Sequence, residues 1–458
     1  MTQSRAGQVV DRVMSLDEDE VESLASSLLT DFSSRHRHYE QLLIRHASIV
    51  GAHLDEAPQL SKARELVLGA TFTAEYSTEA AALCNPSAVL HPDQTQLKRG
   101  QARVAISLRG IGEGHISSIS FCTAVVGPGE QFTFDERPLP VTTGNVTPAR
   151  WRRAHLRAVL AESGTLDELR TAVLRLLPAS FDAADLERAL AEVHHDLLVR
   201  PGAMATVQLL RTLVASTYQV DFDDDVALAQ RVLMPTAAEE RNGMEDARFT
   251  RFVGDDGAVE YRATYTAYDG QRIAPRLLIS QDLRSFSAHR LAGAAARNKG
   301  MALFPRLVGG RHLALCRSDG ESTSLTSSSD GFVWTQPVVT QQPTAPWEQL
   351  QVGNCGPPIE TDRGWLVFTH GVGAMRTYSI GAVLLDIDVP SIVLGRLAQP
   401  LLVPQDDGRD GYVPNVVYSC GAFLHDGRVW LPYGIDDARI GVAWTPLDDL
   451  LDALTPTR

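Results

Sequence analysis

The chain has 458 residues, and its 42 Lys and Arg against 56 Asp and Glu give a formal net charge of −14. With 44% apolar and 21% charged residues, the composition is that of a folded globular protein and excludes a disordered, collagen-like or coiled-coil chain. The excess of carboxylates argues against a nucleic acid or an anionic membrane as partner, because such surfaces attract basic proteins. At about 150 residues per domain, the length allows about three domains or one large β architecture with insertions.

The sequence gives no sign of a membrane or secretory segment. It contains no run of about 18 apolar residues, and its first twenty residues lack the charged-then-apolar pattern of a signal peptide. We therefore expect a cytoplasmic protein. The cysteines are odd in number, scattered and never spaced as zinc ligands would be, so we expect reduced and mostly buried thiols. They are Cys84, Cys122, Cys316, Cys355 and Cys420.

The N-terminal 70 residues are predicted to form a helical extension. The stretch Asp17–Leu29 carries acidic residues in its first turn and then apolar residues at helical spacing. A second helix is expected from Tyr39 to His46. After residue 70 the pattern changes to short alternating runs, such as Ala102–Leu108 and Ser117–Val126, which predict strands.

Residues 141–235 are predicted to be a helical insertion, because apolar side chains such as Leu186, Leu190 and Val193 again recur at helical spacing. The segments 71–140 and 236–458 would then form one β domain. Many short strands with Gly-rich turns are typical of a sandwich, a barrel or a propeller. Roughly 290 residues favour a propeller, since blades of about 40 to 50 residues would number five or six.

The common nucleotide, zinc and serine-hydrolase signatures are missing from the sequence. The glycine-rich segment Arg109–Gly114 lies between two predicted strands, with no helix after it to bind a phosphate through its N-terminus. The acidic run Asp221–Asp225 is interpreted as a solvated loop rather than a cation site. We therefore expect neither a metal nor a bound cofactor.

The segment Asn242–Arg248 (NGMEDAR) places two adjacent carboxylates beside an arginine, just before a β run. If the segment is a strand, Glu245 and Asp246 point to opposite faces. Only one of them could then enter a given cleft, while the other could pair with Arg248. The alternative interpretation is a solvated turn.

Four polar residues at the edges of β runs form a second candidate group: Asn298, Lys299, Arg317 and His370. Cationic groups that converge from separate loops would bind an oxyanion such as phosphate. Taken singly, each could instead be an ordinary surface charge, and His370 could be a core histidine.

A third candidate group lies near the C-terminus, where the segment Tyr433–Asp437 combines a tyrosine with two aspartates. Sugar sites commonly join an aromatic platform to carboxylates that accept hydrogen bonds from hydroxyl groups. The tryptophans Trp347, Trp365 and Trp430 could supply that platform, or they could be core aromatics.

Taken in chain order, short motifs of this sequence resemble glycoside hydrolase family 130, the β-mannoside phosphorylases and related mannosidases. The resemblance covers about residues 75–135 and 240–445, and the helical stretches lie outside it. The motifs are Cys84-Asn85-Pro86, Leu108-Arg109, Glu245-Asp246-Ala247-Arg248, Tyr265-Thr266-Ala267-Tyr268-Asp269-Gly270, Asn298-Lys299, Leu303-Phe304-Pro305, Cys316-Arg317, Gly356-Pro357-Pro358-Ile359, Gly364-Trp365, His370-Gly371, Leu384-Leu385-Asp386, Val413-Pro414-Asn415-Val416-Val417, Cys420-Gly421 and Tyr433-Gly434.

The resemblance implies a mainly β fold, a five-bladed β-propeller with the substrate in its central funnel and with added helical segments. It implies an enzyme that cleaves β-mannosides with inversion, with Asp246 as proton donor. A glycosidic oxygen leaves poorly unless a carboxylic acid protonates it as the bond breaks. Inorganic phosphate would be the co-substrate and would attack the opposite face of the sugar to give mannose 1-phosphate.

The resemblance also assigns site residues by position. The residues implied to contact the substrate are Asn85, Arg109, Glu245, Arg248, Tyr378 and Asp437. The residues implied to bind phosphate are Lys299, Arg317, His370 and Gln351. Three positions depart from the family pattern: Ala247 replaces a proline, Gly300 replaces an aspartate and Gln351 replaces a lysine. Losing one cation weakens phosphate affinity, but three potential cations remain, so we expect phosphorolysis.

Two alternatives stay open. A hydrolase on the same fold would need a second carboxylate about 6.5 to 9.5 Å from Asp246, with a water between them, and Glu360 or Asp436 could serve. A non-catalytic carbohydrate-binding propeller is the other alternative, since fold does not fix function. The helical segments could form a homo-oligomer interface through their apolar stripes.

Overall fold

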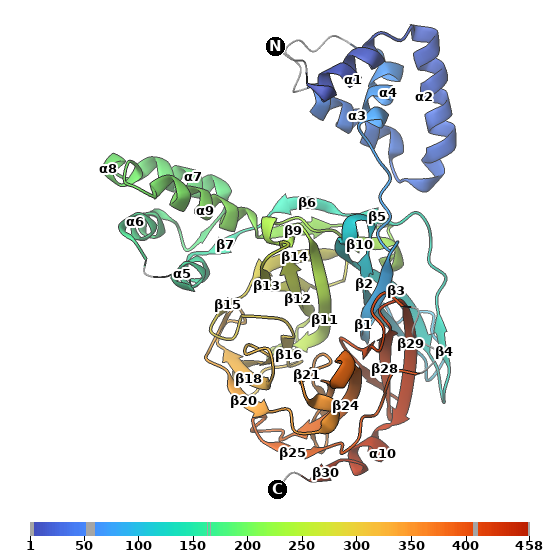
Figure 1. Ribbon diagram of the computed structural model, residues 1–458, viewed down its shortest axis with the longest axis vertical. Coiled ribbons are helices and arrows are strands. Elements are labelled where there is room, and N and C mark those ends of the chain that lie inside the picture. Colours follow the sequence, from blue (N-terminus) through green and yellow to red (C-terminus); the bar gives the residue numbers. More distant parts are fainter. Residues whose placement is uncertain (1–3, 52–59, 163, 165, 406–410, 457–458) are drawn as a thin grey trace. The chain divides into compact units, whose positions relative to one another are not determined.

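The computed structural model describes residues 4–51, 60–162, 164, 166–405 and 411–456. The chain divides into two compact units (Figure 1). The first unit comprises Met1–Ser77 with Arg137–Thr142, and the second comprises Thr78–Glu136 with Thr143–Arg458. The helices of the predicted insertion and the β part therefore belong to one unit.

The first unit contains the helices α1 (Arg5–Met14), α2 (Glu18–Phe32), α3 (Tyr39–Gly51) and α4 (Lys62–Thr71). The side chain of Asp17 accepts a hydrogen bond from the Glu20 backbone N–H, and the Glu20 side chain accepts one from Asp17 in return. This capping box satisfies two amides at the start of α2. Both helices that the sequence predicts in this region are confirmed. Across the described residues, no helix has the length and apolarity needed to cross a bilayer.

The second unit is mainly β, as the sequence predicts, and most of its strands pair in antiparallel order. The largest sheet runs through β1 (Ala82–Leu90), β2 (Ala102–Ile111), β3 (Ser117–Val126), β11 (Gly243–Val253), β12 (Val259–Tyr268), β13 (Ile273–Ser280), β14 (Ser285–Arg290), β9 (Tyr218–Asp221) and β6 (Asn145–Pro148), with β4 (Phe132–Phe134) and β10 (Arg231–Leu233) beside β3. The strands β1, β2 and β3 form a meander that carries two of the predicted site residues.

Three further sheets follow in chain order. The first contains β16 (Ala302–Leu303), β17 (His312–Cys316), β18 (Thr323–Ser328) and β20 (Val338–Gln341). The second contains β21 (Gln351–Asn354), β22 (Ile359–Thr361), β23 (Gly364–Val372), β24 (Tyr378–Leu385), β25 (Val393–Arg396) and β30 (Thr455–Pro456). The third contains β26 (Val417–Tyr418), β27 (Phe423–His425), β28 (Arg428–Ile435) and β29 (Arg439–Pro446), and α10 (Leu447–Asp452) follows it.

The predicted helical insertion is helical over a shorter range than 141–235. Its helices are α5 (Arg153–Glu162), α6 (Glu168–Leu176), α7 (Ala183–Glu192), α8 (His195–Leu198) and α9 (Ala203–Ala215), with two short paired strands, β7 (Trp151–Arg152) and β8 (Ser180–Phe181). The two ends of the range are strands β6 and β9, which pair with each other and join the sheet through β14. Residues of β9 alternate between buried and half-buried, as a strand that faces a core does.

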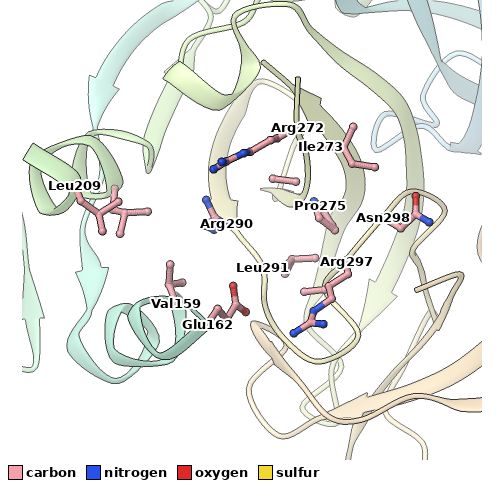
Figure 2. A pocket seen from close by; sticks show the side chains of 13 residues that line it. Val159, Glu162, Leu209, Arg272, Ile273, Pro275, Arg290, Leu291, Arg297 and Asn298 are labelled. Carbon is pink, nitrogen blue, oxygen red and sulfur yellow. The ribbon is translucent and has the colours of Figure 1, made fainter. Parts of the chain in front are cut away.

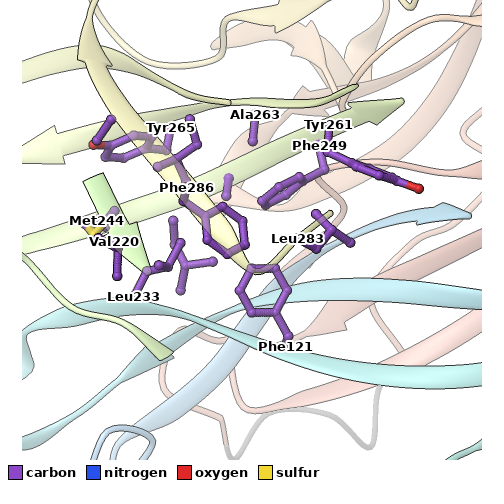
Figure 3. Packing of buried hydrophobic residues seen from close by; sticks show 14 of the residues in the cluster. Phe121, Val220, Leu233, Met244, Phe249, Tyr261, Ala263, Tyr265, Leu283 and Phe286 are labelled. Carbon is purple, nitrogen blue, oxygen red and sulfur yellow. The ribbon is translucent and has the colours of Figure 1, made fainter. Parts of the chain in front are cut away.

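The core of the largest sheet is built around aromatic side chains (Figure 3). The ring of Phe121 lies 5.8 Å from that of Phe249 in an edge-to-face contact and 5.8 Å from that of Phe286 in a stacked one. Such offset and edge contacts are the favoured geometries of buried rings. The five cysteines are free thiols, and all but Cys122 are buried, which confirms the interpretation from their spacing.

Beside this core lies a fully buried ion pair. The guanidinium of Arg276 is 2.9 Å from a carboxylate oxygen of Glu240, and neither side chain has any exposed area. The Glu240 carboxylate also accepts hydrogen bonds from the hydroxyl groups of Tyr218 and Tyr265. A buried charge pair of this kind is stable only while each partner is present.

Candidate active site

The predicted Glu-Asp pair lies in β11, at a bulge that the sequence pattern did not reveal. The pairing of β11 with β12 shifts register between Glu245 and Arg248, and Asp246 has a φ of 54°. A left-handed backbone at a residue other than glycine is uncommon, and a bulge re-aims the side chains around it. The expectation that only one of the two carboxylates could enter a cleft is therefore wrong.

Both carboxylates bind the same arginine of β2. Arg109 donates from Nη2 to Oε1 of Glu245 at 2.7 Å and from Nη1 to Oδ1 of Asp246 at 3.2 Å. Its Nε donates to Ser117 Oγ at 2.9 Å, so the guanidinium is held on three sides. Arg109 thereby joins the two carboxylates into one cluster.

Strand β1 contributes a second residue with a left-handed backbone. Asn85 has a φ of 53°, at the point where β1 shifts register against β2 between Cys84 and Ser87. Its Nδ2 donates to Oδ1 of Asp246 at 2.5 Å. Two matched irregularities, in β1 and in β11, therefore bring an amide and a carboxylate together across 161 residues of sequence.

The charges around Asp246 keep its carboxyl group ionised. Burial would raise the pKa of Asp246, but the charges of Arg109, Lys299 and Arg248 and the hydrogen bond from Asn85 lower it to about 2. The carboxylate is thus negatively charged at neutral pH in the unliganded site.

The predicted phosphate residues lie close to this cluster. Lys299 Nζ is 2.5 Å from Glu245 Oε2, which links it to the carboxylate pair. Asn354 Nδ2 donates to the carbonyl of Gly300 at 2.7 Å, and Arg317 Nη1 is 2.9 Å from His370 Nε2. The sequence prediction that these residues share one region therefore agrees with the contacts.

His370 is a neutral side chain rather than a third cation. Burial, followed by the nearby charges of Arg317 and Arg248, lowers its pKa well below the ordinary value. Because an arginine can only donate, Nε2 of His370 accepts from Arg317, and Nδ1 donates to the Asn354 carbonyl at 3.2 Å. The expectation of three cations is corrected to two, Lys299 and Arg317, with His370 orienting the latter.

Arg248 is buried and contacts the backbone of the cluster rather than its carboxylates. Its Nη1 donates to the backbone carbonyl of Asp246 at 2.9 Å, and its Nη2 donates to the Tyr418 hydroxyl at 2.8 Å. The Tyr418 ring makes an edge contact with His370, and the Tyr378 ring stacks on His370 with centroids 6.1 Å apart. Arg248 therefore holds the bulge in place and is not paired with the Asp246 carboxylate, contrary to one of our expectations.

Gln351 lies in β21, two residues before Gly353, whose register partner in β23 is His370. Residues two apart in a strand face the same side of the sheet. Gln351 thus lies on the side of β21 nearest to the Arg317 and His370 pair, because a Cβ on Gly353 would lie 2.5 Å from the His370 ring.

Other candidates from the sequence are engaged elsewhere. The carboxylate of Glu360 pairs with Arg306 at 2.6 Å, and Asp436 accepts a hydrogen bond from the Val416 amide. Trp365 and Trp430 are fully buried in the core and cannot form a sugar platform.

Sequence reasoning missed three residues that position the site: Ser117, Asn354 and Tyr418. Asn354 lies two residues before the Gly356-Pro357-Pro358-Ile359 motif, and Tyr418 directly follows the Val413–Val417 motif. Proximity to those motifs is a signal that could have found these two residues.

Asp437 is the second carboxyl group near this cluster whose pKa is shifted. Burial and the negative charge of Asp246 raise the pKa of Asp437 to about 6. An aspartate in an unfolded chain titrates near 3.9, so the folded state binds this proton more tightly and loses stability as the pH rises from about 4 to about 6.

We therefore expect the melting temperature of Asp437→Asn to rise relative to wild type as the pH increases from about 4 to about 6, because the variant has no proton to lose. Calorimetry at four or five pH values across this range measures the difference. Asp388→Asn, at an exposed position, reports the general effect of removing a carboxyl group. A constant difference between Asp437→Asn and wild type would show that Asp437 titrates normally.

The structure is that of a mainly β protein whose candidate site has a carboxylate pair beside two cations. Similarity to known proteins identifies its family. A family model described as beta-1,4-mannooligosaccharide phosphorylase matches residues 224–456. The chain belongs to this family, glycoside hydrolase family 130, as the order of its motifs predicts.

Two characterised relatives are similar over much of their length. The 1,2-beta-oligomannan phosphorylase of Thermoanaerobacter sp. (strain X514) is 32% identical over 231 residues, which are 49% of this chain and 75% of the relative. The beta-1,2-mannobiose phosphorylase of the same organism is 33% identical over 218 residues, 46% of this chain and 70% of the relative.

Among solved structures, beta-1,2-mannobiose phosphorylase from Listeria innocua in complex with beta-1,2-mannobiose is similar with a TM-score of 0.50 and 17% identity. The similarity covers 84% of this chain and 94% of that protein. At this identity it supports the fold alone.

Proposed function

We propose that this protein is an inverting mannoside phosphorylase. It cleaves a β-mannoside with inorganic phosphate and releases mannose 1-phosphate and a shortened acceptor. The observation that carries this proposal is the cluster around Asp246, in which Asn85 and Arg109 hold the carboxylate and Lys299 lies on the other side of Glu245. The names of the relatives, mannobiose and oligomannan phosphorylases, support it.

In the proposed reaction Asp246 gives its proton to the glycosidic oxygen as the bond from that oxygen to the anomeric carbon breaks. A phosphate oxygen forms the new bond to the anomeric carbon from the opposite face, which inverts its configuration. No second carboxylate is needed, because phosphate is itself the nucleophile. The proposed reaction uses neither a metal ion nor an organic cofactor.

A donor whose pKa is about 2 must gain a proton before it can act, and the co-substrate provides a physical reason for it to do so. The charge of Lys299 is one of those that lower the pKa of Asp246. Bound phosphate would offset that charge, and its own negative charge would raise the pKa of Asp246. Protonation of Asp246 is then coupled to the presence of the nucleophile.

Lys299 and Arg317 are the groups proposed to bind phosphate, since charge-assisted hydrogen bonds to phosphate oxygens are strong. His370 accepts from Arg317 and so fixes the direction of its guanidinium. Asn85, Arg109, Tyr378 and Asp437 are proposed to contact the mannosyl unit.

The five-bladed propeller is part of the same proposal. Among the described strands, five groups of antiparallel neighbours can be distinguished: β1, β2 and β3; β11 to β14; β16, β17, β18 and β20; β21, β23, β24 and β25, with β22 beside β23; and β28, with β26, β27 and β29 beside it. The first two groups are joined by the parallel pairing of β3 with β11. Each group would form one blade. A cytoplasmic location and an oligomer formed through the helical segments stay predictions.

Phosphate dependence tests the proposed reaction. We expect the protein to release mannose 1-phosphate from β-1,2- or β-1,4-linked manno-oligosaccharides only when inorganic phosphate is present. Product analysis by chromatography and ³¹P NMR, with and without phosphate, measures it. Release of free mannose at the same rate in both conditions would identify a hydrolase instead.

Gln351 offers a test of the anion site by gain of function. Replacing Gln351 with Lys adds a cation on the side of β21 that faces the Arg317 and His370 pair, so the KM for phosphate should fall by about threefold or more. Steady-state kinetics at varied phosphate measures this change. Gln349→Lys, at a neighbouring exposed position, adds the same charge outside the site and should leave KM unchanged. Equal effects of both variants would indicate a general change in surface charge.

A further inference from the structure

A cavity separate from the carboxylate cluster lies between the helical insertion and the β13 and β14 strands (Figure 2). Its volume is about 500 Å³, within the range of small-molecule sites. One wall comes from α5 and α9, and the other from the start of β13, the end of β14 and the segment that follows it. The helices that build the first wall precede the residues 224–456 that match the family model.

The cavity has an aliphatic lining. Val159, Leu209 and Leu213 contribute from the helical side, and Ile273 and Leu291 contribute from the strand side. These side chains favour a ligand with an apolar portion, because burying that portion removes it from water.

Three arginines face the same space, with one carboxylate among them (Figure 2). Arg290 pairs with Glu239 at 2.6 Å, and its Nε is buried without a partner. In the part of the chain that the structure describes, the guanidinium groups of Arg272 and Arg297 form no hydrogen bond or ion pair. Glu162 accepts a hydrogen bond from the Gly293 amide. The cavity therefore keeps donors available for a ligand.

The charge of this cavity contrasts with that of the chain. Although the chain has a net charge of −14, three guanidinium groups and one carboxylate, Glu162, line this cavity, and a second carboxylate, Glu239, pairs with Arg290. Arginine presents several N–H donors in a planar fork that fits the oxygens of a carboxylate or a phosphate. We propose that this cavity binds a small organic anion, a phosphate ester or a carboxylate, whose apolar portion lies on the aliphatic wall.

The cavity lies next to the candidate active site without sharing its charged groups. Asn298 lines the cavity, and Lys299, the next residue, belongs to the carboxylate cluster. The proposal does not rest on the mannoside phosphorylase reaction. Its test must therefore distinguish an anion bound at Arg272 and Arg297 from an anion bound at Lys299 and Arg317, the residues proposed to bind inorganic phosphate.

Isothermal titration calorimetry of the full chain provides that test, with phenyl phosphate and benzoate as anionic probes and benzyl alcohol as their uncharged counterpart. We expect wild type to bind at least one of the anions about tenfold or more tightly than benzyl alcohol. In the double variant Arg272→Gln, Arg297→Gln, the Kd for that anion should rise by about tenfold or more. Both arginines are exposed, so we expect the double variant to fold, and its melting temperature verifies this.

Two control variants complete the design. Arg157→Gln removes an exposed arginine of α5 that does not line the cavity and should bind the anion as wild type does. Arg317→Gln alters the candidate phosphate site and should also retain binding. Any one of four outcomes would overturn the proposal. In the first two, wild type binds neither anion, or it binds the anions no more tightly than benzyl alcohol. In the other two, the double variant binds the anion as tightly as wild type, or binding is lost only in Arg317→Gln. Phosphorolysis, assayed separately, reports on the proposed function.

Discussion

Asp246→Asn is expected to reduce phosphorolysis of a manno-oligosaccharide by roughly 10²- to 10⁴-fold, the range that general acid catalysis contributes. The amide is nearly isosteric with the carboxylate and can still accept hydrogen bonds from Asn85 and Arg109, but it has no proton to give to the glycosidic oxygen. Sugar binding should be nearly intact. Steady-state kinetics with phosphate, together with calorimetric titration of the oligosaccharide, measures both quantities.

An activated substrate separates proton donation from a structural effect. An aryl β-mannoside with an acidic phenol as leaving group departs without protonation, so Asp246→Asn should lose far less activity on it. Asp437→Asn, which removes a proposed sugar contact, should lose activity on both substrates alike. Equal losses of Asp246→Asn on the two substrates would contradict the acid role. If wild type and variant are equally inert yet bind mannosides, the protein is a carbohydrate-binding module.

Arg276→Met should destabilise the second unit by about 3 to 5 kcal/mol, the cost of leaving a buried charge without its partner. Arg276 and Glu240 are both fully buried, and their charged atoms are 2.9 Å apart. Removing the guanidinium leaves the buried Glu240 carboxylate with neutral hydrogen-bond donors alone: the hydroxyl groups of Tyr218 and Tyr265 and the backbone amides of Thr236 and Ala237. Urea denaturation followed by tryptophan fluorescence measures the change.

A surface pair serves as the matched control for this prediction. Arg211 pairs with Glu187 at 2.7 Å, and about half of each side chain is exposed to water. Arg211→Met should leave the urea midpoint unchanged, because exposed ion pairs are screened by solvent. Adding Glu240→Gln to Arg276→Met should recover part of the loss, since it removes the unpaired charge. If both arginine variants behave alike, the buried pair contributes no more than a surface pair.

Much of the secondary structure followed from local sequence patterns. The acidic first turn and the helical spacing of Asp17–Leu29 predict α2, and the alternation in Ala102–Leu108 and Ser117–Val126 predicts β2 and β3. Such patterns depend on residues a few positions apart, so a linear sequence contains them in full. The boundaries of the helical insertion were less well predicted, because β6 and β9 are recognisable as strands only through their pairing with each other and through the pairing of β9 with β14.

The sequence by itself determined the family, through the order of many short motifs, and these motifs identified most residues of the candidate site, but not Ser117, Asn354 and Tyr418. Only the tertiary structure decided how they act. The bulge at Asp246 turns both carboxylates toward Arg109, and burial beside Arg317 leaves His370 neutral. The hydrogen bond from Asn85 to Asp246 spans 161 residues. Charge, protonation and orientation depend on neighbours brought together by folding, and a linear pattern does not contain those distances.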